Sequence, residues 1–478
     1  MGFDYNLVVI GGGAAGLVSS YIGSGVLKAK VALIEKNLMG GDCLNTGCVP
    51  SKALIKSAKI IHQIQNCEKY GIKNASYDFE FSDIMERVHG TIEAIAPHDS
   101  IERYTGLGVE CITGHAEIVD KHTVKVGDKI LRTKNIILAH GAEPFIPPVK
   151  GLDQISYLTS ENLWQLKSLP KRLVILGGGP IGTEMAQSFA RLGSNVTQIE
   201  MGERILQRED PDIADVVIDQ LKKDGVNLKT GLKADGILVE NGEKLLECIN
   251  SEGAKEKIPF DEILFAVGRK ARSIGPNYAE LGIRLRDNGT IDVDKYMRAN
   301  GSNIYACGDI TGPYQFTHMA SHQAYFCVRN ALFPFFKTPV DYSAVPWVTY
   351  SDPEIAQVGL NETEAKRRGI DYEVYTYGVD DLDRAITESE ARGMVKVLTV
   401  PGKDKILGAN IVSYNAGEML TEFIFAMKHG MGLKKLMAVT HPYPTMSEAN
   451  KFAAGIFAKG QMKPGIQNFL EKMMKYMR

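Results

Sequence analysis

The sequence predicts an α/β protein in which one strand–helix–strand unit occurs twice and a separate α+β unit follows. The first observation is a repeated pattern, beginning near Asn6 and again near Lys171, of an apolar strand, a glycine-rich turn, a helix and a second strand ending in glutamate. The second is the length of 478 residues, which exceeds what one compact core ordinarily holds. The third is a change beyond about Asp341, where alternating strands and then helices follow.

The glycine spacing indicates that each copy is a Rossmann-type dinucleotide-binding unit. The glycines are Gly11, Gly13 and Gly16 in the first copy, and Gly177, Gly179 and Gly182 in the second. The first glycine of each set makes a tight turn, the second lets a pyrophosphate approach the backbone, and the third lets helix and strand pack closely. The strands end at Glu35 and Glu200, whose carboxylates can accept hydrogen bonds from a ribose. Two such units predict two different dinucleotides, although an isolated glycine triplet can also be an ordinary loop.

The remaining elements follow from periodicity and turn signals. Residues 78–100 predict a helical stretch, and residues 109–138 predict short strands with turns at Gly114 and Gly127. After residues 266–269 we expect the chain to return to the first domain, because residues 303–309 again resemble a buried strand. Helices are expected at residues 416–428 and 447–457.

Composition narrows the class of protein. The formal charge of -2 and the absence of a polybasic stretch argue against a nucleic-acid partner. No run of about 18 apolar residues occurs, so we expect no membrane partner. The N-terminal residues lack the pattern of a secretory signal, and seven cysteines without a regular framework favour a reduced compartment, so we expect a cytoplasmic protein.

The cysteine pair Cys43 and Cys48 is the strongest chemical signal. On one continuous helix, residues five apart are separated by about 7.5 Å, farther than a disulfide tolerates. The pair can therefore bridge only if Cys43 lies in an irregular segment, which Asn45 and Gly47 allow, and Cys48 opens a helix with Pro50 in its first turn. A helix N-terminus lowers a thiol pKa and would favour a thiolate at Cys48. The alternatives are two buried apolar cysteines or half of a zinc site.

Residues 40–52 and the two glycine motifs together resemble the glutathione reductase, dihydrolipoyl dehydrogenase and mercuric reductase family over essentially the whole chain. The resemblance implies a homodimer that binds FAD and NAD(H). It implies an FAD-binding domain at residues 1–148 and 271–338, an NAD(P)-binding domain at residues 149–270 and a C-terminal α+β dimerisation domain at residues 339–478. NADH is favoured over NADPH because Glu200 would repel a 2′-phosphate and only Arg204 is near in sequence.

The same resemblance implies roles for individual residues. Cys43 would exchange with the substrate, Cys48 would face the flavin, and Lys52 would lie beside the flavin with Glu184 as its acidic partner. Alternatively, Lys52 and Glu184 are surface charges on two helices. The other residues assigned to cofactors are Gly41, Asp42, Gly141, Asp309, Met319 and Ala320 for FAD, and Gly268 for NAD. His140 stands where the family usually has threonine, and we give it no catalytic role.

The segment around Tyr443 bears on the substrate. In dihydrolipoyl dehydrogenases a histidine lies five residues before a glutamate and serves as the acid/base, but the residue five before Glu448 is Tyr443. A phenol with a reference pKa of about 10 is a poor base near neutrality. Mercuric reductases have a tyrosine here, although no cysteine follows Cys327 in this chain as their C-terminal pair would. We expect Tyr443 and Glu448 to act across the homodimer; the alternative is that Tyr443 only packs at the subunit interface.

Three functional hypotheses follow. The leading one is an NADH-dependent flavoenzyme, similar to mercuric reductase, that reduces a small-molecule disulfide or a metal ion at Cys43. The second is a dihydrolipoyl dehydrogenase in which His441 or Tyr443 transfers the proton. The third, from another class, is a redox sensor that keeps FAD but turns over slowly.

Overall fold

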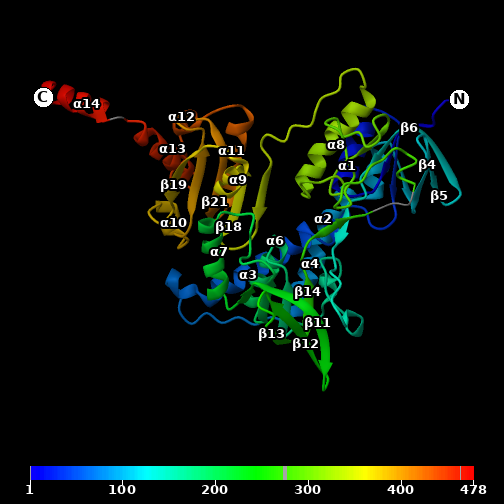
Figure 1. Ribbon diagram of the computed structural model, residues 1–478, viewed down its shortest axis with the longest axis horizontal. Coiled ribbons are helices and arrows are strands. Elements are labelled where there is room, and N and C mark those ends of the chain that lie inside the picture. The colour runs from blue at the N-terminus through cyan, green and yellow to red at the C-terminus, as the bar shows by residue number, and fades with distance from the viewer. Residues whose placement is uncertain (1, 273–276, 463) are drawn as a thin grey trace. The chain divides into compact units, whose positions relative to one another are not determined.

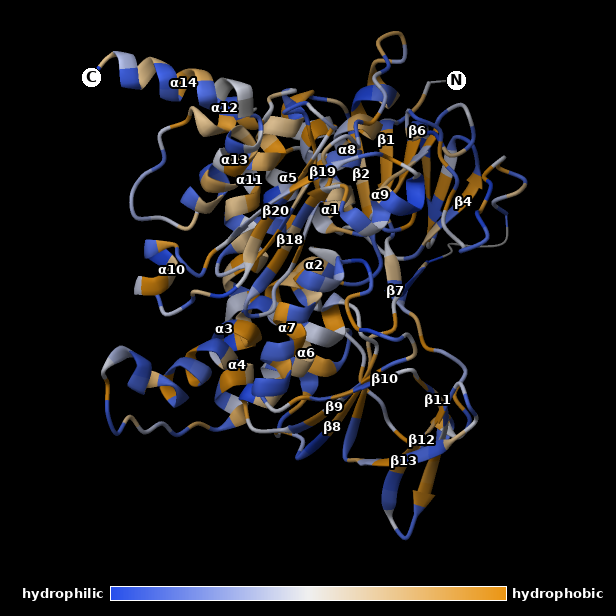
Figure 2. Cartoon of the chain, turned by 60° about the vertical axis from the view of Figure 1, so that its left-hand side comes forward, coloured by the Kyte–Doolittle hydropathy of each residue, from blue (hydrophilic) through white to orange (hydrophobic). Residues whose placement is uncertain are grey.

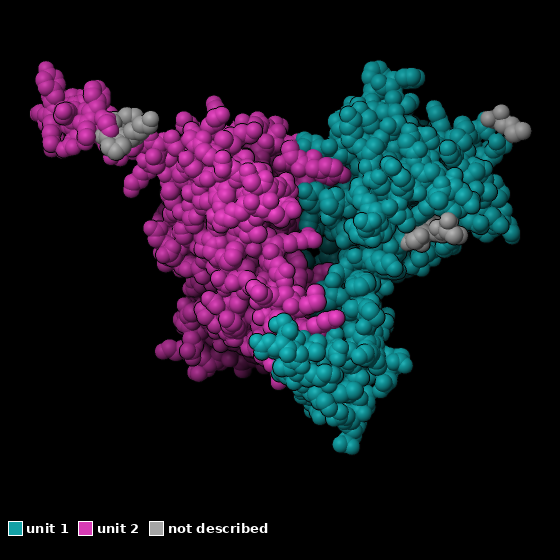
Figure 3. Space-filling view, in the orientation of Figure 1, with its two compact units in different colours: residues 1–58, 78–177, 234–341 teal, residues 59–77, 178–233, 342–478 magenta. Residues whose placement is uncertain are grey.

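The computed structural model describes residues 2–272, 277–462 and 464–478 (Figure 1). Apolar residues are concentrated in the strands of the sheets (Figure 2). The chain divides into two compact units, coloured in Figure 3. Unit 1 consists of Met1–Ala58, Asp78–Gly177 and Ala234–Asp341, and unit 2 of Lys59–Tyr77, Gly178–Lys233 and Tyr342–Arg478.

Unit 1 is built on a seven-stranded sheet with the order β3-β2-β1-β6-β5-β4, in which β16 also pairs with β6. Its strands are β1 (Tyr5–Ile10), β2 (Val31–Glu35), β3 (Val109–Thr113), β4 (Ala116–Asp120), β5 (Thr123–Val126), β6 (Lys129–Leu138) and β16 (Ile304–Ala306). The pairs that link β3, β2, β1, β6 and β16 are parallel, whereas β4, β5 and β6 form an antiparallel meander. The central strands are apolar on both faces because both faces are covered, as is usual for parallel strands.

The helices of unit 1 are α1 (Ala14–Ser20), α2 (Gly41–Asn45), α3 (Cys48–Gln65, continuing into unit 2), α4 (Phe81–Ile95), α5 (Ile101–Gly106) and α8 (Thr317–Leu332). Its other strands are β7 (Ala142–Pro144), β8 (Arg172–Leu176), β11 (Leu232–Glu240), β12 (Glu243–Asn250), β13 (Lys255–Phe260), β14 (Glu262–Phe265) and β15 (Arg269–Ala271). Helices α1 and α8 pack together beside β1, which places their N-termini at the carboxyl end of the parallel strands. In α/β sheets this edge is where ligands bind.

Unit 2 contains a five-stranded antiparallel sheet with the order β17-β18-β21-β20-β19. The strands of this sheet are β17 (Pro346–Thr349), β18 (Glu354–Gly359), β19 (Glu373–Gly378), β20 (Met394–Thr399) and β21 (Ile406–Ser413). Unit 2 also contains the strands β9 (Asn195–Glu200) and β10 (Asn227–Thr230), which lie outside this sheet. Its helices are α6 (Pro180–Arg191), α7 (Pro211–Lys223), α9 (Glu362–Arg368), α10 (Asp383–Thr387), α11 (Ala416–Lys428), α12 (Leu433–Met437), α13 (Glu448–Gly460) and α14 (Pro464–Tyr476). Helices α11 and α13 cover this sheet and bury Phe423 and Phe457 against it.

Most of the predicted elements are present. The α/β class is confirmed, and the chain forms β1–α1–β2 and β8–α6–β9 at the two glycine motifs. The helix predicted at residues 416–428 is α11, and the one predicted at residues 447–457 is α13. Among the described residues, no helix is both long and apolar enough to span a lipid bilayer. The proposed domain boundaries remain a prediction.

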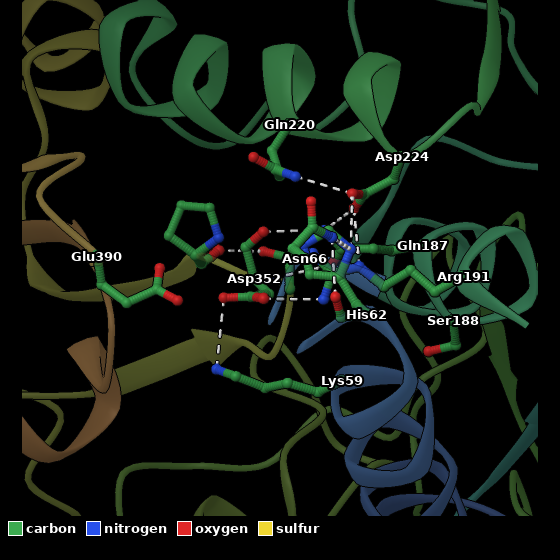
Figure 4. Close-up of polar contacts among 12 residues, drawn as sticks. Lys59, His62, Asn66, Gln187, Ser188, Arg191, Gln220, Asp224, Asp352 and Glu390 are labelled. Carbon is green, nitrogen blue, oxygen red and sulfur yellow. Dashed lines mark hydrogen bonds and ion pairs between the residues drawn. The ribbon is translucent and has the colours of Figure 1, made fainter. Parts of the chain in front are cut away.

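A buried ionic network holds several segments of unit 2 together (Figure 4). The Arg191 side chain is only 3% exposed, and its guanidinium binds the carboxylates of Asp224 at 2.9 Å and Asp352 at 2.8 Å. Asp352 also lies 3.4 Å from Lys59 Nζ and 3.3 Å from Arg392 Nη2. These cations hold the pKa of Asp352 below its usual range even though burial alone would raise it.

A second buried acid of unit 2, Glu209, has a raised pKa, whereas the pKa of Asp352 is lowered. Glu209 accepts a hydrogen bond from Trp347 Nε1 at 3.0 Å, while its Oε2 has no hydrogen-bond partner among the described residues. Burial raises the pKa of Glu209 to about 7. The side chain is therefore protonated in the folded protein at mildly acidic pH.

The raised pKa of Glu209 predicts that unit 2 loses stability as the pH rises from about 4.5 through 7, because the folded state binds a proton that the unfolded state has released. The loss attributable to this group is about 3 kcal/mol. Urea unfolding midpoints measured from pH 5 to 8 should show this loss in the wild type but not in Glu209→Gln. Glu203→Gln, at an exposed position of the same segment, should follow the wild type. Parallel pH profiles of wild type and Glu209→Gln would contradict the expectation.

Candidate active site

The two cysteines lie on two separate helices. Cys43 is in the one-turn helix α2, and Cys48 is the first residue of α3. The expectation that Cys43 lies in an irregular segment was wrong, because residues 41–45 form their own helical turn; the break comes at Thr46 and Gly47. A Cβ at Gly47 would lie 2.9 Å from the carbonyl oxygen of Asp42, so this sharp turn requires glycine. Pro50 is in the first turn of α3, as predicted.

The two thiols of the pair have different surroundings. A hydrogen bond to Cys48 and burial raise the pKa of the Cys43 thiol well above its ordinary value. Cys48 Sγ lies at the N-terminus of α3 and 3.4 Å from Thr317 Oγ1, at the start of α8. Both cysteines are free thiols. The Cys43 thiol is therefore hard to deprotonate in this environment.

An acidic side chain stands close to this pair. Asp99 Oδ2 lies 3.1 Å from the position of a Cβ on Gly40, the residue before α2, and the carboxylate opposes ionisation of Cys43. Burial raises the pKa of Asp99, and the nearby Arg103 and His98 act against that rise. Asp99 was not predicted, because 56 positions separate it from Cys43 and no motif connects the two.

The first glycine motif forms a cradle that has no room for side chains. Gly11 has φ +107°, and a Cβ there would collide with the carbonyl oxygen of Ala139. A Cβ on Gly41 would lie 2.6 Å from the Cα of Gly13, so the turn that carries Cys43 touches the glycine loop. Glu35 accepts hydrogen bonds from the amides of Gly12 at 2.6 Å and Asn37 at 2.7 Å. The absence of side chains at a helix N-terminus fits a pyrophosphate.

The residues predicted for the second half of the FAD site also lie in unit 1. Asp309 follows β16, and burial raises its pKa. Arg269 Nε lies 3.5 Å from Asp309, and its Nη2 donates to Asp42. A Cβ on Gly308 would come within 3.3 Å of Ala15 and 3.4 Å of Ala320, so α1, β16 and α8 converge here. Met319 and Ala320 are buried in the first turn of α8. The backbone of Gly141 has a positive φ of +69°. Lys52 lies in α3, with its Nζ 3.4 Å from Ser51 Oγ.

The second glycine motif repeats the geometry of the first. Gly177 has φ +116°, and a Cβ there would collide with the carbonyl oxygen of Ala266, as at Gly11 with Ala139. Glu200 accepts hydrogen bonds from the amides of Gly178 at 2.6 Å and Gly202 at 2.7 Å, in the same arrangement as Glu35. Gly179 caps the start of α6, and Gly182 is buried in its first turn. Gly268 has φ +126°.

Two further positions are buried in ways that the sequence did not specify. Glu184 in α6 accepts a hydrogen bond from the Tyr350 amide at 2.9 Å, so it is not a surface charge. His140 Nε2 lies 3.1 Å from the Tyr278 hydroxyl, and burial lowers the pKa of His140 to about 3. A neutral imidazole in this position agrees with a packing role.

Tyr443 and His441, in the segment before α13, differ in exposure and in their hydrogen-bond partners. Tyr443 is 72% exposed, and its hydroxyl donates to Asp383 Oδ2 at 2.7 Å, which raises the pKa of the phenol. The His441 side chain is only 5% exposed, with Nε2 2.9 Å from Glu422 Oε1 and Nδ1 3.2 Å from the carbonyl oxygen of Val439. Glu448 begins α13 and accepts from the Thr445 amide at 3.1 Å. The Asp383 and Glu422 contacts were not predicted.

Two glycine cradles, one of which adjoins a pair of unequal thiols, are the features of a dinucleotide-dependent oxidoreductase with redox cysteines. Residues 5–324 match the pyridine nucleotide-disulphide oxidoreductase family, and residues 345–454 match the dimerisation domain of the same family. The chain belongs to this family. It is therefore an FAD-dependent disulfide oxidoreductase, and the dimerisation domain indicates a homodimer. The roles of individual site residues remain predictions.

Relatives in this family have different acceptors. The chain is 33% identical to a mercuric reductase of Bacillus cereus, over 96% of this chain and 73% of the relative. It is 35% identical to a dihydrolipoamide dehydrogenase of Chaetomium thermophilum, over 94% of this chain and 90% of the relative. Among solved structures, a copper(II) complex of the HOCl-induced flavoprotein disulfide reductase RclA from Escherichia coli is 28% identical with a TM-score of 0.82, covering 95% of this chain and 99% of that chain.

Proposed function

We propose that this flavoenzyme uses NADH to reduce a thiol-binding metal ion at Cys43 and Cys48, as a mercuric reductase does. The observation that carries the proposal is Tyr443, which stands where a dihydrolipoyl dehydrogenase needs a base. Its hydroxyl is a donor to Asp383, and its pKa is raised above the ordinary value of a phenol. Such a group does not accept a proton from a dithiol near neutral pH. A metal ion bound by thiolates requires no such base.

The residues present fit FAD. The cradle of Gly11, Gly13 and Gly16 with Glu35 would hold its adenosine and pyrophosphate, and Asp309 with the start of α8 would hold its other half. When bound, FAD supplies the two-electron relay between a nicotinamide and the cysteine pair. We keep the cytoplasm as the proposed compartment, because thiols stay reduced there.

The charge and softness of the site favour a cation as acceptor. Thiolates are soft ligands that select ions such as copper and mercury. Asp99, beside the turn that carries Cys43, adds a negative charge that attracts a cation and repels an anionic disulfide. The reduced pair can bind the ion through both sulfur atoms. Forming the Cys43–Cys48 disulfide releases two electrons, which reduce one mercury(II) ion to mercury(0) or two copper(II) ions to copper(I).

A second candidate function is dihydrolipoyl dehydrogenase activity. His441 and Glu422 form a histidine–carboxylate pair at 2.9 Å, the arrangement that an acid/base catalyst requires. Two observations argue against this second function. The His441 side chain is nearly buried, and its Nδ1 contacts the carbonyl oxygen of Val439. A slow redox sensor is the third candidate, and sustained NADH consumption with any acceptor would exclude it.

The test compares acceptors with the purified, FAD-loaded enzyme. NADH oxidation is followed with mercury(II) supplied with excess low-molecular-weight thiol, with copper(II) supplied as a thiol-free amino-acid chelate, and with lipoamide; dihydrolipoamide oxidation by NAD is followed in reverse. We expect turnover with a metal ion to exceed that with lipoamide by roughly a hundredfold. His441→Gln should leave the metal reaction unchanged. Robust lipoamide turnover that is lost in His441→Gln would instead establish the second candidate.

The nicotinamide preference is a separate expectation. Glu200 would repel a 2′-phosphate, and Arg204 is engaged by Asp215 and does not compensate. We expect kcat/KM for NADH to exceed that for NADPH at least about tenfold. Glu200→Gln should lower the ratio of kcat/KM for NADH to kcat/KM for NADPH, mainly by raising kcat/KM for NADPH. Arg204→Gln should leave this ratio near the wild-type value. Equal use of both nucleotides by the wild type would contradict the assignment.

A further inference from the structure

The hydroxyl group of Thr317 lies against the cysteine pair. Thr317 is the first residue of α8, and its Oγ1 is 3.4 Å from Cys48 Sγ, although 269 positions separate the two residues in the sequence. The same hydroxyl forms a hydrogen bond with the Cys43 thiol. All three residues belong to unit 1. One hydroxyl group therefore contacts both sulfur atoms of the pair.

The position of Thr317 in α8 leaves its hydroxyl available for this contact. Threonine stabilises the start of a helix when it is the N-cap residue, because its hydroxyl then accepts a hydrogen bond from a backbone amide. The N-cap of α8 is Phe316 instead, which makes no side-chain capping hydrogen bond. Thr317 is also only partly buried, so it is not a core residue of unit 1. Its contact with the two sulfur atoms is what distinguishes it.

A hydroxyl donor distinguishes the two redox states of a cysteine pair. A threonine hydroxyl donates one hydrogen bond, and a neutral sulfur atom is a weak acceptor. A thiolate is charged and accepts a much stronger hydrogen bond. A disulfide carries no charge, whereas a pair reduced by two electrons and one proton contains one thiolate. The Thr317 hydroxyl therefore binds the reduced pair more strongly than the oxidised pair.

We propose that Thr317 is a further catalytic residue, whose hydroxyl donates to the thiolate of the reduced pair and so raises the reduction potential of the Cys43–Cys48 disulfide. In the net step, NADH and the disulfide give NAD, one thiol and one thiolate. The S–S bond breaks, and the hydride of NADH supplies both electrons and the proton of the thiol, by way of the bound FAD. The inference rests on the cysteine pair of the proposed function, but not on which acceptor the pair reduces.

The surroundings of Cys43 make such a donor necessary. The hydrogen bond to Cys48, burial and the carboxylate of Asp99 all raise the pKa of the Cys43 thiol, and the hydrogen bond from Thr317 acts against that rise. These three effects oppose negative charge on the pair. Without the Thr317 hydroxyl the reduced pair would be less stable, and the disulfide would be harder for NADH to reduce.

The reduction potential of the pair in the FAD-loaded enzyme tests the proposal. The enzyme is equilibrated without oxygen in graded ratios of reduced to oxidised dithiothreitol, quenched in acid and alkylated after unfolding. Mass spectrometry of the peptide that carries both cysteines gives the oxidised fraction. Thr317→Val removes the hydroxyl and keeps the branched shape, so it should shift the equilibrium about tenfold toward the disulfide, a fall of about 30 mV in potential. Thr317→Ser keeps the hydroxyl and should have the wild-type potential.

Ser321→Ala is the matched control. Ser321 Oγ donates to the carbonyl oxygen of Thr317 at 3.2 Å, so this variant also removes a hydroxyl from the start of α8. It should leave the potential unchanged. Flavin absorbance per protein shows whether each variant holds FAD, and Thr317→Ala removes the hydroxyl if the valine variant does not fold.

Two outcomes would overturn the proposal. In the first, the variants without the hydroxyl keep the wild-type potential. In the second, Thr317→Ser shifts the potential as far as Thr317→Val, because packing of the side chain rather than its hydroxyl would then be the cause. Both outcomes are independent of the acceptor, since an enzyme that reduced lipoamide rather than a metal ion would show the same shift.

Discussion

Replacing Cys48 by serine is expected to lower acceptor turnover at least about a thousandfold while NADH still reduces the bound FAD. Serine cannot form the disulfide, so electrons have no route from the cofactor to Cys43. Stopped-flow absorbance separates the two half-reactions. The effect should be nearly as large for Cys43→Ser.

The matched control for this experiment is Cys111→Ser. Cys111 is a partly exposed thiol of β3 in the same unit and belongs to no cysteine pair of the site. It should retain wild-type turnover. If Cys48→Ser and Cys111→Ser behaved alike, the cysteine pair would not be the site of acceptor reduction.

Replacing Arg191 by methionine should destabilise unit 2 by about 3–5 kcal/mol. Arg191 is 3% exposed and neutralises Asp224 and Asp352, so its loss leaves two buried carboxylates with an insufficient positive charge. Methionine fills a similar volume, which limits the contribution of a cavity to the effect. The urea midpoint of unfolding measures the change.

Arg204→Met provides the comparison, because Arg204 pairs with Asp215 at an exposed position of the same unit. Exposed pairs contribute about 0–1 kcal/mol, so its midpoint should hardly move. A shift in Arg191→Met no larger than that in Arg204→Met would mean that the network of Figure 4 contributes little to stability.

Local patterns in the sequence predicted much of the fold and site. The glycine sets at Gly11 and Gly177 encode backbone angles and close approaches that no other residue permits, and both form the predicted turns. Helix α11 has the predicted bounds because its apolar period and its flanking residues lie in one short segment. The separation of Cys43 and Cys48 by a helix break also follows from residues between them.

The contacts that site residues make with residues distant in the sequence could not be predicted from local patterns. The Tyr443–Asp383 hydrogen bond joins residues 60 positions apart, and the His441–Glu422 pair joins residues 19 apart. Asp99 reaches the turn before Cys43 only because α4 and the turn that follows it pack against α2. No periodicity or spacing connects such residues, since tertiary packing alone brings them together.

Glu200 uses both carboxylate oxygens to bind backbone amides, one from Gly178 and one from Gly202. A neutral replacement such as glutamine can satisfy only one of these amides, and a shorter side chain reaches neither. Glu200 therefore also holds the turn from Glu200 to Gln207 in place, and an exchange of this whole segment has to supply new partners for both amides. Point mutants would show relaxed selectivity at the cost of a weakened turn.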